Sequence, residues 1–144
     1  MKVLVNHDIL DGRLSIINFI NGCLHDVIRI ENDTVIRLYR TGEYWNAFEQ
    51  SAYWLCHQSE KSEITLLRNP ISPFPVVMAT IPNNTMLVLR RKHIFQYEAP
   101  GYCELVGPKL SSKQYGEWHH KEVASFMSCL NNVGSYSLTN ILYY

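Results

Sequence analysis

The sequence lacks an excess of either charge. Lys and Arg together number 13, Asp and Glu also number 13, and the formal net charge is zero. A protein that binds nucleic acid by neutralising phosphates normally carries a clear basic excess. The balance therefore argues against a nucleic-acid partner and against an acidic mimic of nucleic acid. A protein partner would be recognised through shape and a few aromatic or arginine anchors, with little long-range steering.

Long hydrophobic runs are also lacking. No stretch approaches the roughly 20 apolar residues that span a bilayer, and His7 and Asp8 interrupt the apolar start before a secretory signal could form. The four cysteines show no Cys-x-x-Cys spacing, which argues against a zinc knuckle or a thioredoxin-like pair. These absences predict a cytoplasmic protein without membrane contact, whose thiols are free and mostly buried.

Proline is confined to one part of the chain. All six prolines lie between Pro70 and Pro108, and proline interrupts helices and central strands. The middle of the chain is therefore expected to form short strands and turns, while the flanks can form helices. A length of 144 residues with 47% hydrophobic residues fits a single domain over 1–144.

Periodicity and turn residues predict the order of the elements. Hairpins are expected around 32–33 and 82–84, where turn-forming residues separate apolar runs. Helices are expected at 43–58, with Thr41 as a candidate N-cap, and from Ser111 to about residue 131. The segment 10–21 fits a buried helix or a strand, and Gly22 as a C-cap favours a short helix. Strands are expected at 2–5, 24–30, 34–40, 63–68, 74–81, 85–90 and 93–97, with a last strand within 135–144. The predicted fold class is α+β, with a mostly antiparallel sheet built from hairpins and two or three packed helices.

Two aromatic residues are placed unusually on the predicted 43–58 helix. Tyr53 and Trp54 project from the side opposite the apolar stripe. One interpretation is that a second layer of structure covers them, as happens to many aromatics. The alternative is that they form a contact patch, because Trp and Tyr are enriched at binding hot spots.

One basic run stands out, Arg90-Arg91-Lys92. It is compatible with the solvated end of a strand. It could also meet an acidic patch on a protein partner, because planar guanidinium groups recognise carboxylates. The run is too short to indicate nucleic-acid binding. Tyr53, Trp54 and this basic run are the candidate partner-binding residues.

His119 and Glu122 are the strongest catalytic candidates. They lie three residues apart on the predicted C-terminal helix, so their side chains can pair. Such a pair is either a structural hydrogen bond at the edge of the core or an acid–base couple in a cleft. The His7-Asp8 and His25-Asp26 dipeptides suggest a metal enzyme only weakly, because neighbouring strand residues face opposite sides. No metal or other cofactor is predicted.

The stretch from Ile20 to Leu38 resembles a pattern of small bacterial immunity proteins. It places a short helix, Gly22, Leu24 and His25-Asp26 before a two-stranded hairpin. Proteins of that kind bind and neutralise polymorphic or contact-dependent growth-inhibition toxins. The resemblance implies a non-enzymatic inhibitor with a cognate toxin domain as partner. The alternatives are a small enzyme that uses His119 and Glu122, and a regulatory subunit that binds another protein.

Overall fold

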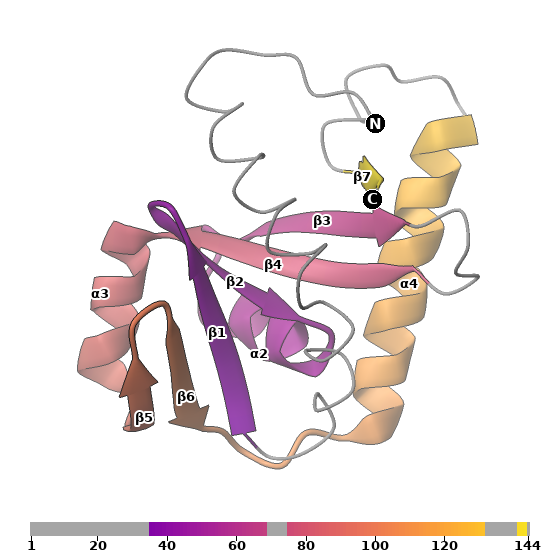
Figure 1. The fold of residues 1–144 in the computed structure, drawn as a ribbon. Helices are drawn as coiled ribbons and strands as arrows, with labels where there is room; N and C mark the ends of the chain where they lie inside the picture. The colour runs from indigo at the N-terminus through magenta and orange to yellow at the C-terminus, as the bar shows by residue number, and fades with distance from the viewer. Residues whose placement is uncertain (1–34, 69–74, 132–140, 144) are drawn as a thin grey trace.

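A computed structural model describes residues 35–68, 75–131 and 141–143. Within these ranges the chain forms seven strands and three helices (Figure 1). The strands are β1 (Val35–Thr41), β2 (Tyr44–Phe48), β3 (Glu63–Arg68), β4 (Val76–Pro82), β5 (Phe95–Ala99), β6 (Tyr102–Val106) and β7 (Ile141–Tyr143). The helices are α2 (Gln50–Gln58), α3 (Asn83–Lys92) and α4 (Ser112–Asn131).

All seven strands form one sheet, in the order β5-β6-β1-β2-β4-β3-β7. The first six pair antiparallel, and β7 alone joins the edge in parallel, beside β3. Tight turns make the hairpins β1–β2 and β5–β6, with Gly42 and Gly101 at positive φ, a conformation that glycine adopts at little cost. The predicted α+β class with a mostly antiparallel sheet is confirmed.

The three helices pack on one face of this sheet. Because side chains alternate along a strand, Ile36, Leu38, Trp45 and Ala47 point to the same side, and all are buried. Buried residues of α2 and α3 complete this cluster, and Trp118 of α4 packs against its border. Figure 1 shows α2 behind β1 and β2, with α3 and α4 at opposite ends of β4. The two short helices and the long one thus cover the sheet along the length of β4.

The opposite face of the sheet is also buried, and it holds a polar group. The Asn46 side chain is 1% exposed; its amide donates to Thr41 Oγ1 at 2.8 Å and accepts from Thr80 Oγ1 at 2.8 Å. These partners satisfy the amide, as burial requires. Thr41, predicted as a helix N-cap, is instead the last residue of β1.

Several predicted elements are confirmed. Strand β3 has the predicted bounds, β4 and β5 lie within two residues of theirs, and α4 spans the predicted helix. Ser111 caps α4, since its hydroxyl accepts from the Gln114 N–H at 3.3 Å. The predicted apolar stripe of α4, including Val123 and Phe126, packs on Leu66 and Val77. Cys56 and Cys103 are free thiols, as expected.

The predicted helix at 43–58 is partly wrong. Its first part is strand β2, and helix begins only at Gln50. Strand β2 pairs with β1 on one side and β4 on the other. It buries Trp45 and Ala47 on one face and Asn46 and Phe48 on the other. A strand covered on both faces has a near-continuous apolar sequence, which periodicity cannot distinguish from a buried helix.

The predicted strand at 85–90 is wrong, because this segment is helix α3. Met86 and Leu89, three residues apart, are its buried residues, which is helical spacing. Residues 86–89 are four consecutive apolar residues, and periodicity cannot distinguish such a short run from a buried strand. The basic last turn interacts favourably with the helix dipole, and Pro82 at the N-cap has no N–H to leave unpaired.

The sequence prediction also missed strand β6. Its signal was the Pro100-Gly101 pair, which favours a tight turn between two strands. In addition, β1 has β2 and β6 as its sheet neighbours, so the hairpin expected with 24–30 is not formed by β1. The elements predicted at 2–5, 10–21 and 24–30, and the His7-Asp8 and His25-Asp26 dipeptides, lie outside the described residues.

Candidate functional sites

Glu49 occupies the sharp connection between β2 and α2. Its backbone has φ 54° and ψ −117°, the one non-glycine residue at positive φ among those the structure describes. Such a conformation costs on the order of 1–3 kcal/mol and persists only when its surroundings enforce it. Here the enforcement comes from Val77 on β4. The Glu49 N–H donates to Val77 O at 2.9 Å, and the Val77 N–H donates to Glu49 Oε1 at 2.9 Å.

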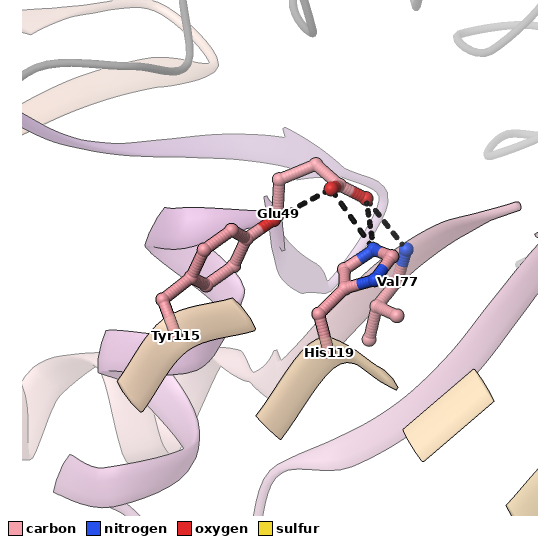
Figure 2. A network of polar contacts seen from close by, with 4 residues as sticks. All are labelled: Glu49, Val77, Tyr115 and His119. Atoms are coloured by element: carbon pink, nitrogen blue, oxygen red, sulfur yellow. Dashed lines mark hydrogen bonds and ion pairs between the residues drawn. The ribbon is translucent and has the colours of Figure 1, made fainter. Parts of the chain in front are cut away.

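Two side chains of α4 meet the Glu49 carboxylate (Figure 2). Tyr115 and His119 lie four residues apart, so both point from the same side of the helix. The Tyr115 hydroxyl donates to Glu49 Oε2 at 2.6 Å. His119 Nε2 lies 3.0 Å from Oε2 and 3.2 Å from Oε1. We call Glu49, Val77, Tyr115 and His119 the glutamate cluster.

Electrostatics in the glutamate cluster favour a charged histidine. The hydrogen bond from His119 to Glu49 raises the pKa of the imidazole, against the opposing effect of burial. The side chains of His119 and Glu49 are only 22% and 17% exposed. Both carboxylate oxygens already accept hydrogen bonds from the fold. The cluster therefore joins α4 to the β2–α2 connection and to β4.

The expected pair of His119 with Glu122 is not what the structure shows. The ion pair of His119 is with Glu49, 70 residues away in the sequence. Glu122 is half-buried and lies near Cys56, where its charge adds to burial in raising the pKa of that thiol to about 11. Sequence reasoning missed Glu49. The available signal was the spacing of Tyr115 and His119, which places both polar side chains beside the apolar stripe of the helix. Buried polar groups need hydrogen-bond partners, so another part of the chain had to supply one.

The two predicted aromatic anchors are covered by other structure. Trp54 is 3% exposed and belongs to the core, where its ring lies 5.0 Å from that of His93. Tyr53 is half-buried, and its ring lies 5.3 Å from Trp118 and 6.0 Å from Tyr115 of α4. The structure thus matches the interpretation in which a second layer covers these residues. Tyr53 connects α2 to α4.

Arg90 is engaged within the fold. Its guanidinium lies 4.8 Å from the ring centroid of Phe95 and 5.7 Å from that of Trp45, distances at which a cation is attracted to an aromatic face. It also forms an ion pair with Glu98 of β5. Arg90 therefore attaches α3 to the sheet.

Arg91 and Lys92 differ from Arg90, because both are exposed on the outer side of α3. Neither forms an ion pair within the part of the chain that the structure describes. One turn earlier, Leu87 is 53% exposed and Val88 is 45% exposed. Positions 87, 88, 91 and 92 follow the i, i+3, i+4 spacing of a single helix face. We call these four residues the α3 stripe.

Two further exposed apolar residues lie beyond the C-terminal end of α3. Ile94 lies two residues after the last residue of α3 and is 76% exposed. Its carbonyl accepts the N–H of Val106 at 3.3 Å, and Val106 is itself 56% exposed. Single exposed apolar residues are normal on a protein surface. Leu87, Val88, Ile94 and Val106 are therefore four exposed apolar residues on α3, just after it and at the end of β6.

The described part of the chain has neither a metal-binding cluster nor a membrane-spanning helix. Among the described residues, no group of three or more His, Cys, Asp or Glu side chains could hold a metal ion. Within the same ranges, no helix is long and apolar enough to cross a membrane. Comparison of the chain with protein-family models, curated proteins and solved structures found no significant match.

Proposed function

We propose that this protein is a non-enzymatic immunity protein that binds and neutralises a cognate bacterial toxin. The observation that carries the proposal is the α3 stripe, in which exposed Leu87 and Val88 lie one turn from the exposed cations Arg91 and Lys92. An inhibitor needs a preformed surface that combines apolar contact area with charged groups. It needs no catalytic residue.

The glutamate cluster supports binding over catalysis. The enzyme hypothesis relied on His119 with Glu122 as its acid–base pair, whereas His119 forms its ion pair with Glu49. Tyr115 and the Val77 N–H occupy further acceptor positions of that carboxylate. A substrate would have to displace hydrogen bonds that hold α4 in place.

The choice of a toxin as partner rests on the resemblance of residues 20–38 to immunity proteins. Strand β1 supplies the end of that stretch, from Val35 to Leu38, and the preceding residues lie outside the described part of the chain. The neutral net charge leaves the chemistry of the toxin open, since inhibitors of nucleases are often acidic.

Co-expression with a candidate toxin domain from a neighbouring gene tests the proposal. We expect the protein to restore growth of cells that produce that domain, and the two purified proteins to bind in calorimetry. The variants H119N and E122Q should protect as well as the native protein, provided that they remain folded by circular dichroism. Binding without protection would favour a regulatory subunit, and absence of both would refute the proposal.

A further inference from the structure

We propose that the α3 stripe binds an acidic protein surface in which carboxylates flank an apolar side chain. The proposal rests on the proposed function and deepens it, because it specifies the chemistry of the surface that the partner presents. The carboxylates would pair with Arg91 and Lys92, and the apolar side chain would contact Leu87 and Val88.

Charge complementarity identifies the partner as acidic. Helix α3 contains three basic residues and no acidic residue. The third cation, Arg90, already pairs with Glu98 and lies over Phe95, so it does not contribute to the free charge. Arg91 and Lys92 remain as two adjacent exposed cations. A carboxylate would pair with the planar guanidinium group of Arg91 and with the ammonium group of Lys92, which acts as a point charge.

The apolar half of the stripe makes a protein surface the preferred partner. Leu87 and Val88 lie between one and two helical turns from the start of α3, and the two exposed cations lie one turn further on. Apolar and basic groups therefore follow each other along one face of the helix. Interfaces between proteins combine an apolar centre with a charged rim in this way. In a symmetric contact of α3 with α3, a second copy of this chain would offer no acidic group to match the cations.

The rigidity of α3 supports a preformed binding surface. Met86 and Leu89 are 0% and 2% exposed and fasten the inner side of the helix to the core. The Trp45 indole donates to Asn83 Oδ1 at 3.1 Å, and the Asn83 N–H donates to Glu43 O at 2.9 Å, which anchors the first turn. A helix held at both ends and along its inner side presents its outer residues at low entropic cost.

The experiment uses two helical peptides of about 15 residues, long enough to populate a helix. The acidic peptide carries a leucine stripe flanked by glutamates, and the basic peptide has lysine in place of each glutamate. Binding to the full chain is followed by fluorescence anisotropy at about 20 and about 500 mM NaCl, because salt screens exposed charges. We expect the acidic peptide to bind more tightly, with the difference shrinking at high salt.

Matched variants locate the binding surface. R91Q/K92Q should weaken binding of the acidic peptide about tenfold, and L87S/V88S should weaken it similarly. The control K113Q/K121Q neutralises two exposed lysines on α4 and should change binding by less than about twofold. The control Y97S replaces an exposed aromatic residue of β5 and should also bind normally. Circular dichroism establishes that each variant is folded.

Several outcomes would overturn the inference. The first is equal binding of the acidic and the basic peptide. The second is a loss of acidic-peptide binding in K113Q/K121Q as large as that in R91Q/K92Q. The third is tighter binding to phosphatidylserine vesicles, through Arg91 and Lys92, than to the acidic peptide. Dimerisation in sedimentation that L87S/V88S abolishes would assign the stripe to a second copy instead. Full protection against the toxin by R91Q/K92Q would refute the inference and leave the proposed function intact. If neither the native protein nor any variant protected against the toxin, while the native protein still bound the acidic peptide, the proposed function alone would be refuted.

Discussion

The glutamate cluster and the α3 stripe both contain charged side chains, but these side chains are in opposite situations. In the cluster, Glu49 and His119 are more than three-quarters buried and satisfy each other. On the stripe, Arg91 and Lys92 are exposed, and the residues that the structure describes offer them no counter-ion. Removing one member of a charged pair that is matched within the fold leaves the other buried without a partner, which destabilises the fold. Charged groups left unmatched beside apolar side chains are available to a partner.

The largest expected effect comes from removing the Glu49 carboxylate. E49A leaves His119, the Tyr115 hydroxyl and the Val77 N–H without their acceptor, and we expect it to lower the free energy of unfolding by about 2–4 kcal/mol. E49G should be less damaging by about 1 kcal/mol, because glycine adopts positive φ without strain. Urea denaturation measures both. E117A, an exposed glutamate on α4, is the control; equal losses in E117A and E49A would contradict the structural role.

A second prediction concerns pH. Because Glu49 raises the pKa of His119 above 6.5 in the folded protein, the charged pair contributes fully below pH 6.5 and its contribution is lost as the pH rises through the folded pKa. H119N should therefore cost about 1–2 kcal/mol at pH 6 and less at pH 9. Urea unfolding across this range tests it, with H120N, an exposed neighbour, as control. A constant difference between H119N and the native protein would exclude the charged pair.

Removing one hydroxyl from the cluster should have a smaller effect. Y115F deletes the donor to Glu49 Oε2 and retains the ring that packs near Tyr53 and Trp118. We expect a loss of about 1 kcal/mol in the free energy of unfolding. Y97F, which removes an exposed hydroxyl from β5, provides the comparison. Equal stability of Y115F and the native protein would show that the hydroxyl contributes nothing.

The smallest effects distinguish neighbours within α3. R90A loses the ring contacts with Phe95 and Trp45 and the ion pair with Glu98, and should cost about 1 kcal/mol. R91A should change the free energy of unfolding by less than about 0.5 kcal/mol. Thermal unfolding of both variants in parallel makes the comparison. If R91A proved as destabilising as R90A, Arg91 would belong to the fold and not to a binding surface.

Local patterns were sufficient for part of the fold. Ser111 and the apolar stripe of α4 predicted a long helix with its inner face on the sheet, and the short run at 63–68 predicted β3. These predictions succeeded because a cap and a one-sided stripe act over a few residues. The prediction of a helix over residues 43–58 was partly wrong because contacts with distant parts of the chain decide the conformation there. Strand β2 is covered on both faces and lies between two other strands, so pairing and not periodicity decided its conformation.

The candidate sites also divide into features that local sequence predicted and features that contacts between distant residues decided. The basic run at 90–92 was identified from sequence, but only the fold separates Arg90, which lies over two aromatic rings, from its exposed neighbours. Tyr53 and Trp54 were candidates as surface aromatics, and packing of α2 against the sheet and α4 placed both under cover. Glu49 itself carried no local signal, because its partners lie 28 to 70 residues away; the available clue was the spacing of Tyr115 and His119 on α4.

By itself, the sequence determined the fold class, the long C-terminal helix and the absence of net charge. Each depends on composition or on contacts within a few residues. Only the tertiary structure decided which charged groups find a partner within the fold and which aromatic groups are buried. Matching depends on strand order and on helix packing, which join residues far apart in the chain and bury some of them while leaving Leu87, Val88, Arg91 and Lys92 exposed.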